Sequence, residues 1–354
     1  MMNDIQILIG DVRKTLKDVP DNSVNCCVTS PPYYGLRSYI PDDADYKDAE
    51  IGMEQTPEEF IQNLVEVFRE VKRVLTNDGV CYINIADSYC GTGDKGNWTD
   101  PKYPEGRNGQ RVSKNRKIEG IKSKDLIGIP WMLAFALRAD GWFWRDTVIW
   151  AKACSGVYSG GSVLPESVVD RTCRGHEYIL MFTKKAKYFY NKDAIAEKQS
   201  ASSLRRAFSN NNMDARKGKG DEQYAISGKR QDKSYAKARA KIEAGEEMTR
   251  NRRSVWTVNL RPSEVGHFAA YPAELVEPCI LSGCPDNGVV LDPFGGTGTT
   301  AVMATLLGRK AIHCDLDPRT SDFIEERKRE IIKQRNSDGE TITNGKIVKA
   351  RKLF

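Results

Sequence analysis

Residues 289 to 300 read Val-Val-Leu-Asp-Pro-Phe-Gly-Gly-Thr-Gly-Thr-Thr, which is an apolar strand, a glycine loop and the start of a helix. Glycines at such a junction let a ligand approach the backbone closely, and the helix N-terminus offers free N–H groups. The spacing is not the dinucleotide pattern Gly-x-Gly-x-x-Gly. It is not a phosphate P-loop either, because no Gly-Lys-Ser/Thr follows. The pattern predicts a nucleotide-type cofactor site.

Apolar strands and amphipathic helices alternate along most of the chain, which predicts an α/β fold with a mostly parallel sheet. Strands are predicted at residues 5–9, 24–28, 80–85, 142–150, 178–183, 289–292 and 310–314. A helix is predicted from Pro57, with Thr56 as its N-cap and Glu59 completing a capping box. The tail, residues 338–354, is expected to be loose.

Positive charge is unevenly distributed along the 354 residues, whose net charge is +6. Residues 198–253 carry a net +8 and residues 91–124 a net +5, so the rest of the chain carries −7. Basic segments of this kind are typical of a surface for a polyanion, and the alternative is a pair of solvated loops. The predicted organisation is an ordered part at 1–197 with a mobile loop at 91–124, an insertion at 198–253, and a second ordered part at 254–337.

Several classes of protein are excluded by composition. The nine cysteines and three histidines are scattered and form no Cys-x-x-Cys, so neither a metal site nor a disulfide framework is predicted. No apolar run approaches the ~20 residues that span a bilayer, and the N-terminus lacks the features of a secretory signal. We therefore expect a cytoplasmic protein with no metal and no membrane partner.

A second motif ends the strand at residues 24–28. Thr29-Ser30-Pro31-Pro32-Tyr33-Tyr34 stops the strand, because two prolines cannot continue a hydrogen-bonded ladder. In an open parallel sheet, ligands bind outside the carboxyl ends of the strands, where this stiff loop would lie. Its tyrosines offer faces on which a base can stack, worth roughly 1–3 kcal/mol per base. The alternative is a turn with two surface aromatics.

Together the two motifs resemble the DNA amino-methyltransferases. The catalytic loop of that family reads (Ser/Asn/Asp)-Pro-Pro-(Tyr/Phe), and the matching residues are Ser30, Pro31, Pro32 and Tyr33. The family's S-adenosylmethionine loop reads Asp-Pro-Phe-x-Gly-Ser-Gly-Thr-Thr, which residues 292–300 match with Thr297 in place of serine. The catalytic loop comes first, as in the permuted β group. The resemblance implies a Rossmann-like methyltransferase fold, S-adenosylmethionine as cofactor, double-stranded DNA as substrate, and a homodimer.

The resemblance also implies a set of cofactor-binding residues. These are Asp11, His267, Phe268, Asp292, Pro293, Phe294, Gly296, Thr297, Gly298, Thr299 and Asp315. Asp315 would accept the ribose hydroxyls and Asp11 the adenine amine, although a helix cap or a turn is the alternative for each aspartate. Residues 267–272 match the segment that closes over the methionine end of the cofactor. A tyrosine common in the family is Thr320 here, which leaves its packing role open, and Glu177 matches a segment near the target base.

The chemistry that the resemblance implies is methyl transfer to the exocyclic amine of a flipped-out base. The Ser30 side chain and the Pro31 carbonyl would accept hydrogen bonds from the amine, and Tyr33 would stack on the base. The serine form favours cytosine N4 over adenine N6. Two other classes stay open, a non-catalytic binding protein on the same fold and an RNA or protein methyltransferase. The resemblance further implies that residues 1–197 form the catalytic half, residues 254–337 the cofactor-binding half, and residues 198–253 the insertion that recognises the target sequence. Lys and Arg of residues 198–253 and 91–124 would contact DNA phosphates.

Overall fold

The computed structural model of the chain describes residues 4–36, 38–91, 118–152, 168–199, 240, 244, 248–261, 263, 270–343 and 346–349. By its internal contacts the chain divides into two units. The first combines Met1–Asn191 with Ser254–Phe354, and the second is Lys192–Arg253. The large sheet and the α-helices described below belong to the first unit.

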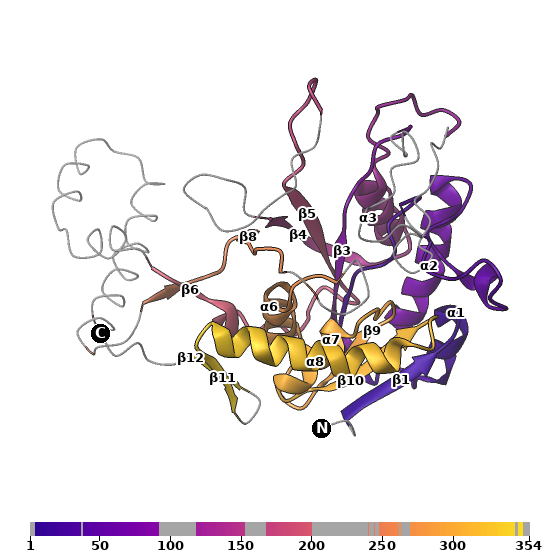
Figure 1. Cartoon of the computed structure of the whole chain (residues 1–354). Helices are drawn as coiled ribbons and strands as arrows, with labels where there is room; N and C mark the ends of the chain where they lie inside the picture. Colours follow the sequence, from indigo (N-terminus) through magenta and orange to yellow (C-terminus); the bar gives the residue numbers. More distant parts are fainter. Residues whose placement is uncertain are drawn as a thin grey trace, which may run out of the picture. The chain divides into compact units, whose positions relative to one another are not determined.

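An eight-stranded sheet lies at the centre of the first unit (Figure 1). Its strand order is β1-β10-β9-β2-β3-β5-β4-β8. In that order, the strands are Ile5–Ile9, Lys310–Asp315, Val289–Asp292, Val24–Thr29, Leu75–Ile85, His176–Thr183, Phe143–Ala151 and Val255–Thr257. The strands from β1 to β3 are parallel, β5 is antiparallel to both its neighbours, and β8 is parallel to β4. The predicted α/β fold with a mostly parallel sheet is confirmed.

Helices cover both faces of this sheet. They are α1 (Val12–Thr15), α2 (Pro57–Val74), α3 (Ile129–Ala139), α6 (Ala273–Gly283), α7 (Thr299–Leu306) and α8 (Thr320–Ser337), with short 3-10 turns at Leu16–Asp18 and Lys47–Ala49. The predicted capping box opens α2. The Thr56 hydroxyl accepts from the Glu59 N–H at 3.2 Å, and the Glu59 carboxylate accepts from the Thr56 N–H at 3.1 Å. Both side chains thus satisfy backbone donors that the helix leaves unpaired.

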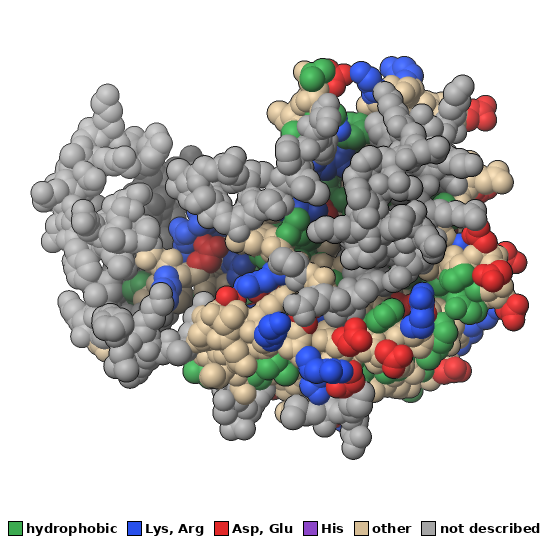
Figure 2. Space-filling model, viewed as in Figure 1, with side chains coloured by type: hydrophobic (Ala, Val, Ile, Leu, Met, Phe, Trp, Pro, Cys, Tyr) green, Lys and Arg blue, Asp and Glu red, His purple; other side chains and the backbone are tan. Residues whose placement is uncertain are grey.

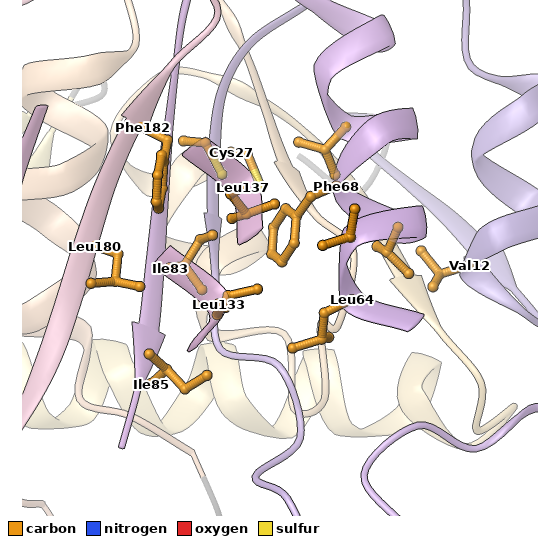
Figure 3. Packing of buried hydrophobic residues seen from close by; sticks show 14 of the residues in the cluster. Val12, Cys27, Leu64, Phe68, Ile83, Ile85, Leu133, Leu137, Leu180 and Phe182 are labelled. Atoms are coloured by element: carbon orange, nitrogen blue, oxygen red, sulfur yellow. The ribbon is translucent and has the colours of Figure 1, made fainter. Parts of the chain in front are cut away.

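Neighbouring residues of the central strands point to opposite faces of the sheet and build two cores. Cys27 and Phe182 face the core under α2 and α3, where Phe68 is fully buried (Figure 3). Cys26 and Met181 face the other core, which α6, α7 and α8 cover. Because both faces are buried, these strands read in the sequence as nearly continuous apolar runs.

The direction of the chain connections reverses between β2 and β9. From β9 the chain passes through α7 to β10 on one side, and from β2 it passes through α2 to β3 on the other. In open α/β sheets, ligands bind in the crevice outside the carboxyl ends of the strands at such a reversal. The loops that leave β2 and β9 there are the Ser-Pro-Pro-Tyr loop and the glycine loop.

Residues 338–354 were predicted to form a loose tail. This prediction is wrong for residues 340–343 and 346–349, which form two strands. β11 (Glu340–Thr343) and β12 (Lys346–Lys349) form an antiparallel hairpin. Glu340 is buried and pairs with Arg335 of α8 at 2.8 Å, which anchors the hairpin. The sequence contains a signal for this hairpin, because Asn344-Gly345 between two short alternating runs is typical of a hairpin turn. In the second unit, β6 (Glu197–Lys198) pairs with β7 (Thr249–Arg250) after a 3-10 turn at Asp193–Ile195.

The expected DNA-contacting segments are only partly covered by the structure. Residues 92–117 of the basic loop and most of residues 200–247 lie outside the described residues, so their expected roles stay predictions. The exposed charges of α8 have both signs, with Asp322 and Glu326 followed by Arg329 and Lys333. Figure 2 shows acidic and basic side chains, red and blue, mixed on the lower part of the face in view. The face that this helix forms is therefore not a continuous basic surface.

Two kinds of feature are absent from the described residues, namely a membrane-spanning helix and a cluster of metal-ligating side chains. None of the helices there combines the length and apolar character needed to cross a membrane. No group of three or more His, Cys, Asp or Glu side chains in the same part of the chain could hold a metal ion.

The packing of the core predicts how much stability is lost when a buried side chain is removed. Phe68→Ala should lower the free energy of unfolding by about 3–5 kcal/mol, because the ring is fully buried between α2 and the sheet. Phe143 is 44% exposed at the start of β4, so Phe143→Ala should cost less than about 1 kcal/mol. Urea unfolding followed by circular dichroism measures both variants. Equal losses would contradict the placement of Phe68 in the core.

Candidate functional site

Two side-chain hydrogen bonds join the end of β2 to β9 and α7, and so bring the two motifs together. The Thr29 hydroxyl donates to Asp292 Oδ1 at 2.6 Å, and the two residues are 263 positions apart in the sequence. The Thr300 hydroxyl donates to the Val28 carbonyl oxygen at 3.1 Å. All four residues are buried. These bonds fix the start of the Ser-Pro-Pro-Tyr loop against the glycine loop.

Both loops line one cavity of about 390 Å³. The predicted site residues in its wall are Asp11, Ser30, Pro31, Pro32, Tyr33, Pro293, Phe294, Gly296, Thr297, Thr299 and Asp315. Asp292 and Gly298 are not part of the wall, and His267 and Phe268 lie outside the described residues. The structure thus brings together residues from the ends of β1, β2, β9 and β10.

Asp292 lies beneath the glycine loop instead of facing the cavity. Only 1% of it is exposed, and its carboxylate accepts hydrogen bonds from the Thr29 hydroxyl, the Phe294 N–H at 3.1 Å and the Tyr271 hydroxyl at 3.2 Å. Burial raises the pKa of Asp292, while the donors around it oppose the rise. Asp292 therefore holds the two loops in place from below.

The glycine loop runs directly over a buried histidine. A Cβ atom on Gly295 would lie 2.0 Å from His313 Cε1, so only glycine fits. Burial lowers the pKa of His313 to about 4, which keeps the ring neutral. The Thr320 hydroxyl donates to the Gly296 carbonyl at 2.7 Å, so His313 Nε2, 2.6 Å away, must carry the hydrogen that it shares with Thr320. Thr320 therefore supports the loop at the position left open above.

Asp315 and Asp11, which lie at or after strand ends, differ in the partners that their carboxylates already have. Asp315 accepts from the Gly296 N–H at 2.6 Å and from the Asp317 N–H at 2.8 Å, one bond to each oxygen. Each oxygen keeps a second acceptor position for a ligand. Burial raises the pKa of Asp315 to about 7. Asp11 caps α1 and pairs with the Arg13 guanidinium at 2.9 Å, so the helix-cap alternative holds for it in addition to its place in the wall.

The other half of the cavity surrounds Glu177 of β5. Its Oε2 accepts from the Tyr33 hydroxyl at 2.5 Å and from Asn84 Nδ2 at 2.9 Å, while Oε1 pairs with Lys152 Nζ. Burial, followed by the charge of Glu177, raises the pKa of Tyr33 well above its ordinary value, so the phenol keeps its proton. Sequence reasoning assigned no role to Asn84 or Lys152. The available signals were an amide inside the apolar run at 80–85 and a lysine directly after a strand.

Two further residues support the half of the cavity that the glycine loop lines. Tyr271 lines the cavity wall and reaches Asp292. Arg327 of α8 is 2% exposed and donates from Nε to the Thr299 hydroxyl at 3.0 Å and from Nη2 to the Tyr271 carbonyl at 3.3 Å. It also pairs with Glu330. An arginine inside a charged helix reads as solvent-exposed, so no local signal identifies it.

The close approach at Gly295 can be tested by adding one methyl group. Gly295→Ala should lower the free energy of unfolding by about 1–3 kcal/mol, because the added Cβ would overlap the His313 ring. Combining it with His313→Ala makes room for the methyl group. The double variant should therefore lose less than the two single variants together, as measured by urea unfolding. A Gly295→Ala protein with wild-type stability would contradict the observed packing.

The sequence matches known proteins over most of its length. Residues 24–326 match the family described as DNA methylase. The chain is 36% identical over 324 residues to the Type II methyltransferase M.Cfr9I of Citrobacter freundii, covering 91% of this chain and 87% of that protein. It is 34% identical over 328 residues to the Type II methyltransferase M.SmaI of Serratia marcescens, covering 92% and 91%.

The fold is also found among solved structures. The chain is similar to the PvuII DNA methyltransferase (cytosine-N4-specific) with a TM-score of 0.55. The sequence identity is 16%, and the match covers 97% of this chain and 96% of that one. At this identity the likeness shows a shared Rossmann-like methyltransferase fold.

Proposed function

Because the chain belongs to the DNA methylase family, whose members are S-adenosylmethionine-dependent methyltransferases, we propose that it methylates cytosine N4 in double-stranded DNA. One observation carries the proposal. The Ser-Pro-Pro-Tyr loop and the glycine loop line a single cavity, and the Thr29–Asp292 hydrogen bond holds them together. A cavity with only one of these loops would support binding without transfer.

The residues on the cofactor side fit S-adenosylmethionine, which when bound supplies a sulfonium methyl group. The free acceptor positions of Asp315 suit the two ribose hydroxyls. Gly296 adds no side chain to the cavity wall, and Pro293 and Phe294 form apolar wall beside it. We assign Asp315 to the ribose and leave Asp11, paired with Arg13, as a candidate for the adenine amine.

The residues on the other side suit an exocyclic amine. Such an amine is a weak nucleophile, because its lone pair is delocalised into the ring. The Ser30 hydroxyl and the Pro31 carbonyl would accept its hydrogens, which draws the nitrogen toward tetrahedral geometry at near-attack distance. The base must first be flipped out of the duplex, at a cost of a few kcal/mol, and Tyr33 would stack on it. Serine at position 30 favours cytosine, since adenine-N6 enzymes more often carry Asp or Asn there.

Nucleoside mass spectrometry tests this proposal directly. The protein is incubated with mixed-sequence duplex DNA and S-adenosylmethionine, and 4-methylcytosine is the expected product. A 6-methyladenine product would keep the reaction class and overturn the choice of base. If neither appears in a protein that binds the cofactor, the proposal is wrong. Parallel reactions with RNA and peptide then separate the remaining alternatives.

Ser30→Ala should lower the methyl-transfer rate by about 100-fold or more, because it removes an acceptor that acts on the amine during transfer. Affinity for S-adenosylmethionine should stay at the wild-type value, since Ser30 is assigned to the base side of the cavity. Single-turnover rates and calorimetric titration measure the two quantities. Ser337→Ala, at the exposed end of α8, is the matched control. A Ser30→Ala protein with the full rate would exclude this role.

Affinity for S-adenosylmethionine should fall as the pH drops below the pKa of about 7 that burial gives Asp315. Ionised Asp315 accepts both hydroxyls and protonated Asp315 does not, so affinity is constant above this pKa and falls about tenfold per pH unit below it. Asp315→Asn should weaken binding by about 10- to 100-fold and remove the pH dependence. Calorimetry between about pH 5.5 and 8.5 gives both profiles, and identical profiles would contradict the assignment.

Two partner assignments belong to the proposal. DNA would be held by Lys and Arg of residues 198–253 and 91–124, so DNA binding should weaken steeply as salt rises. The homodimer that the resemblance implies stays a prediction, which sedimentation velocity can measure.

A further inference from the structure

One face of α8 packs directly against the glycine loop. Thr320, Ile324 and Arg327 lie on this face, because they follow one another at spacings of four and three residues. The Thr320 hydroxyl donates to the Gly296 carbonyl at 2.7 Å. A Cβ atom on Gly298 would lie 2.4 Å from Ile324 Cγ1. The first two residues of the face therefore contact the loop itself, and Arg327 continues the same face beyond it.

Arg327 connects two separate parts of the cavity wall. Its Nε donates to the Thr299 hydroxyl at 3.0 Å, and its Nη2 donates to the Tyr271 carbonyl at 3.3 Å. Thr299 begins α7 and Tyr271 precedes α6, yet both line the cavity. The third nitrogen, Nη1, donates to Glu330. Because a guanidinium is planar and rigid, these bonds fix Thr299 and Tyr271 relative to one another.

Tyr271 is held at both of its ends. Its hydroxyl donates to Asp292 Oδ2 at 3.2 Å and also contacts the Thr300 hydroxyl. Its backbone carbonyl accepts from Arg327. If the guanidinium were removed, the bonds of the hydroxyl would remain, but the backbone of Tyr271 would lose its bond to α8.

Stability alone does not account for an arginine at this position. Arg327 is 2% exposed, and its partner Glu330 is 8% exposed. Burial of an arginine is unfavourable even beside a carboxyl group, since desolvation offsets much of the attraction, and apolar side chains of similar volume often stabilise a protein as well. An apolar side chain cannot supply three directed hydrogen bonds to acceptors in separate segments of the chain.

We propose that Arg327 is a positioning residue for S-adenosylmethionine: from outside the cavity wall, it holds Thr299 and Tyr271 in the places that the cofactor requires. This inference rests on the proposed function for the ligand that occupies this half of the cavity. A lysine at position 327 would keep a cation near Glu330. Its single nitrogen lacks the rigid fork that joins the two wall residues.

Arg327→Lys and Arg327→Met test the inference through cofactor affinity, measured by calorimetric titration without DNA. Both variants should bind S-adenosylmethionine about tenfold more weakly or worse, because Thr299 and Tyr271 are no longer fixed relative to one another. The single-turnover rate at saturating cofactor should stay within about threefold of the wild type, since the Ser-Pro-Pro-Tyr loop is unchanged. A folded variant with affinity within about twofold of the wild type would overturn the inference.

Arg309→Met is the matched control. Arg309 is also buried, pairs with Asp286 at 2.6 Å and donates to the Cys284 carbonyl at 3.3 Å, but it lies outside the cavity wall. Arg309→Met should lower the free energy of unfolding in urea and keep cofactor affinity within about twofold of the wild type. An equal loss of affinity in this control would overturn the inference. If neither Arg327 variant folds, Arg327 is a structural residue, and the inference is likewise wrong.

Cofactor binding distinguishes this inference from the proposed function. A wild-type protein that binds S-adenosylmethionine but methylates neither cytosine nor adenine overturns the proposed function, while the affinities of the Arg327 variants still decide the role of Arg327. A wild-type protein that methylates DNA, together with Arg327 variants that bind the cofactor normally, overturns only the role of Arg327.

Discussion

The parallel pairing of β2 with β9, closed by the hydrogen bond from Thr29 to Asp292, brings the Ser-Pro-Pro-Tyr loop and the glycine loop to one cavity. A buried carboxylate is unfavourable unless donors surround it, and Asp292 has donors from both strand ends and from Tyr271. Removal of one donor to a buried charge costs about 1.5–3 kcal/mol. Separation of the two loops would therefore carry at least this free-energy penalty. The relative position of the two loops is therefore fixed, and the chemistry of the site depends on the side chains that line the cavity above Asp292.

The two halves of the cavity use buried carboxylates in different ways. In the half that the glycine loop lines, the Asp315 carboxylate accepts from two backbone N–H groups, and burial raises its pKa to about 7. In the half that the Ser-Pro-Pro-Tyr loop lines, Glu177 forms an ion pair with Lys152. The first arrangement leaves a carboxylate ready to gain from new donors. The second keeps a carboxylate occupied, so that it orders its neighbours.

The sequence was sufficient for features whose cause is local. The capping box at Thr56, the stop at Pro31 and Pro32, and the glycine loop all follow from nearby residues. The strand order does not, because β1 and β2 are neighbours in sequence but β9 and β10 separate them in the sheet. The cluster around Glu177 depends on the register that places Trp150 opposite Glu177, with Lys152 just beyond. Asp292 belongs to a motif but lies beneath it, which only packing reveals.

That strand order has a consequence for synthesis on the ribosome. β1 pairs only with β10 within the described sheet, and β2 needs β9 on one of its edges, so the emerging N-terminal half cannot complete its own sheet. At about 5–20 residues per second, the 263 residues from Thr29 to Asp292 take roughly 13 to 50 seconds to translate. During that interval the nascent chain exposes unpaired strand edges, which are prone to aggregation. It also has no active cavity, so an incomplete chain would carry the Ser-Pro-Pro-Tyr loop without the means to modify a genome.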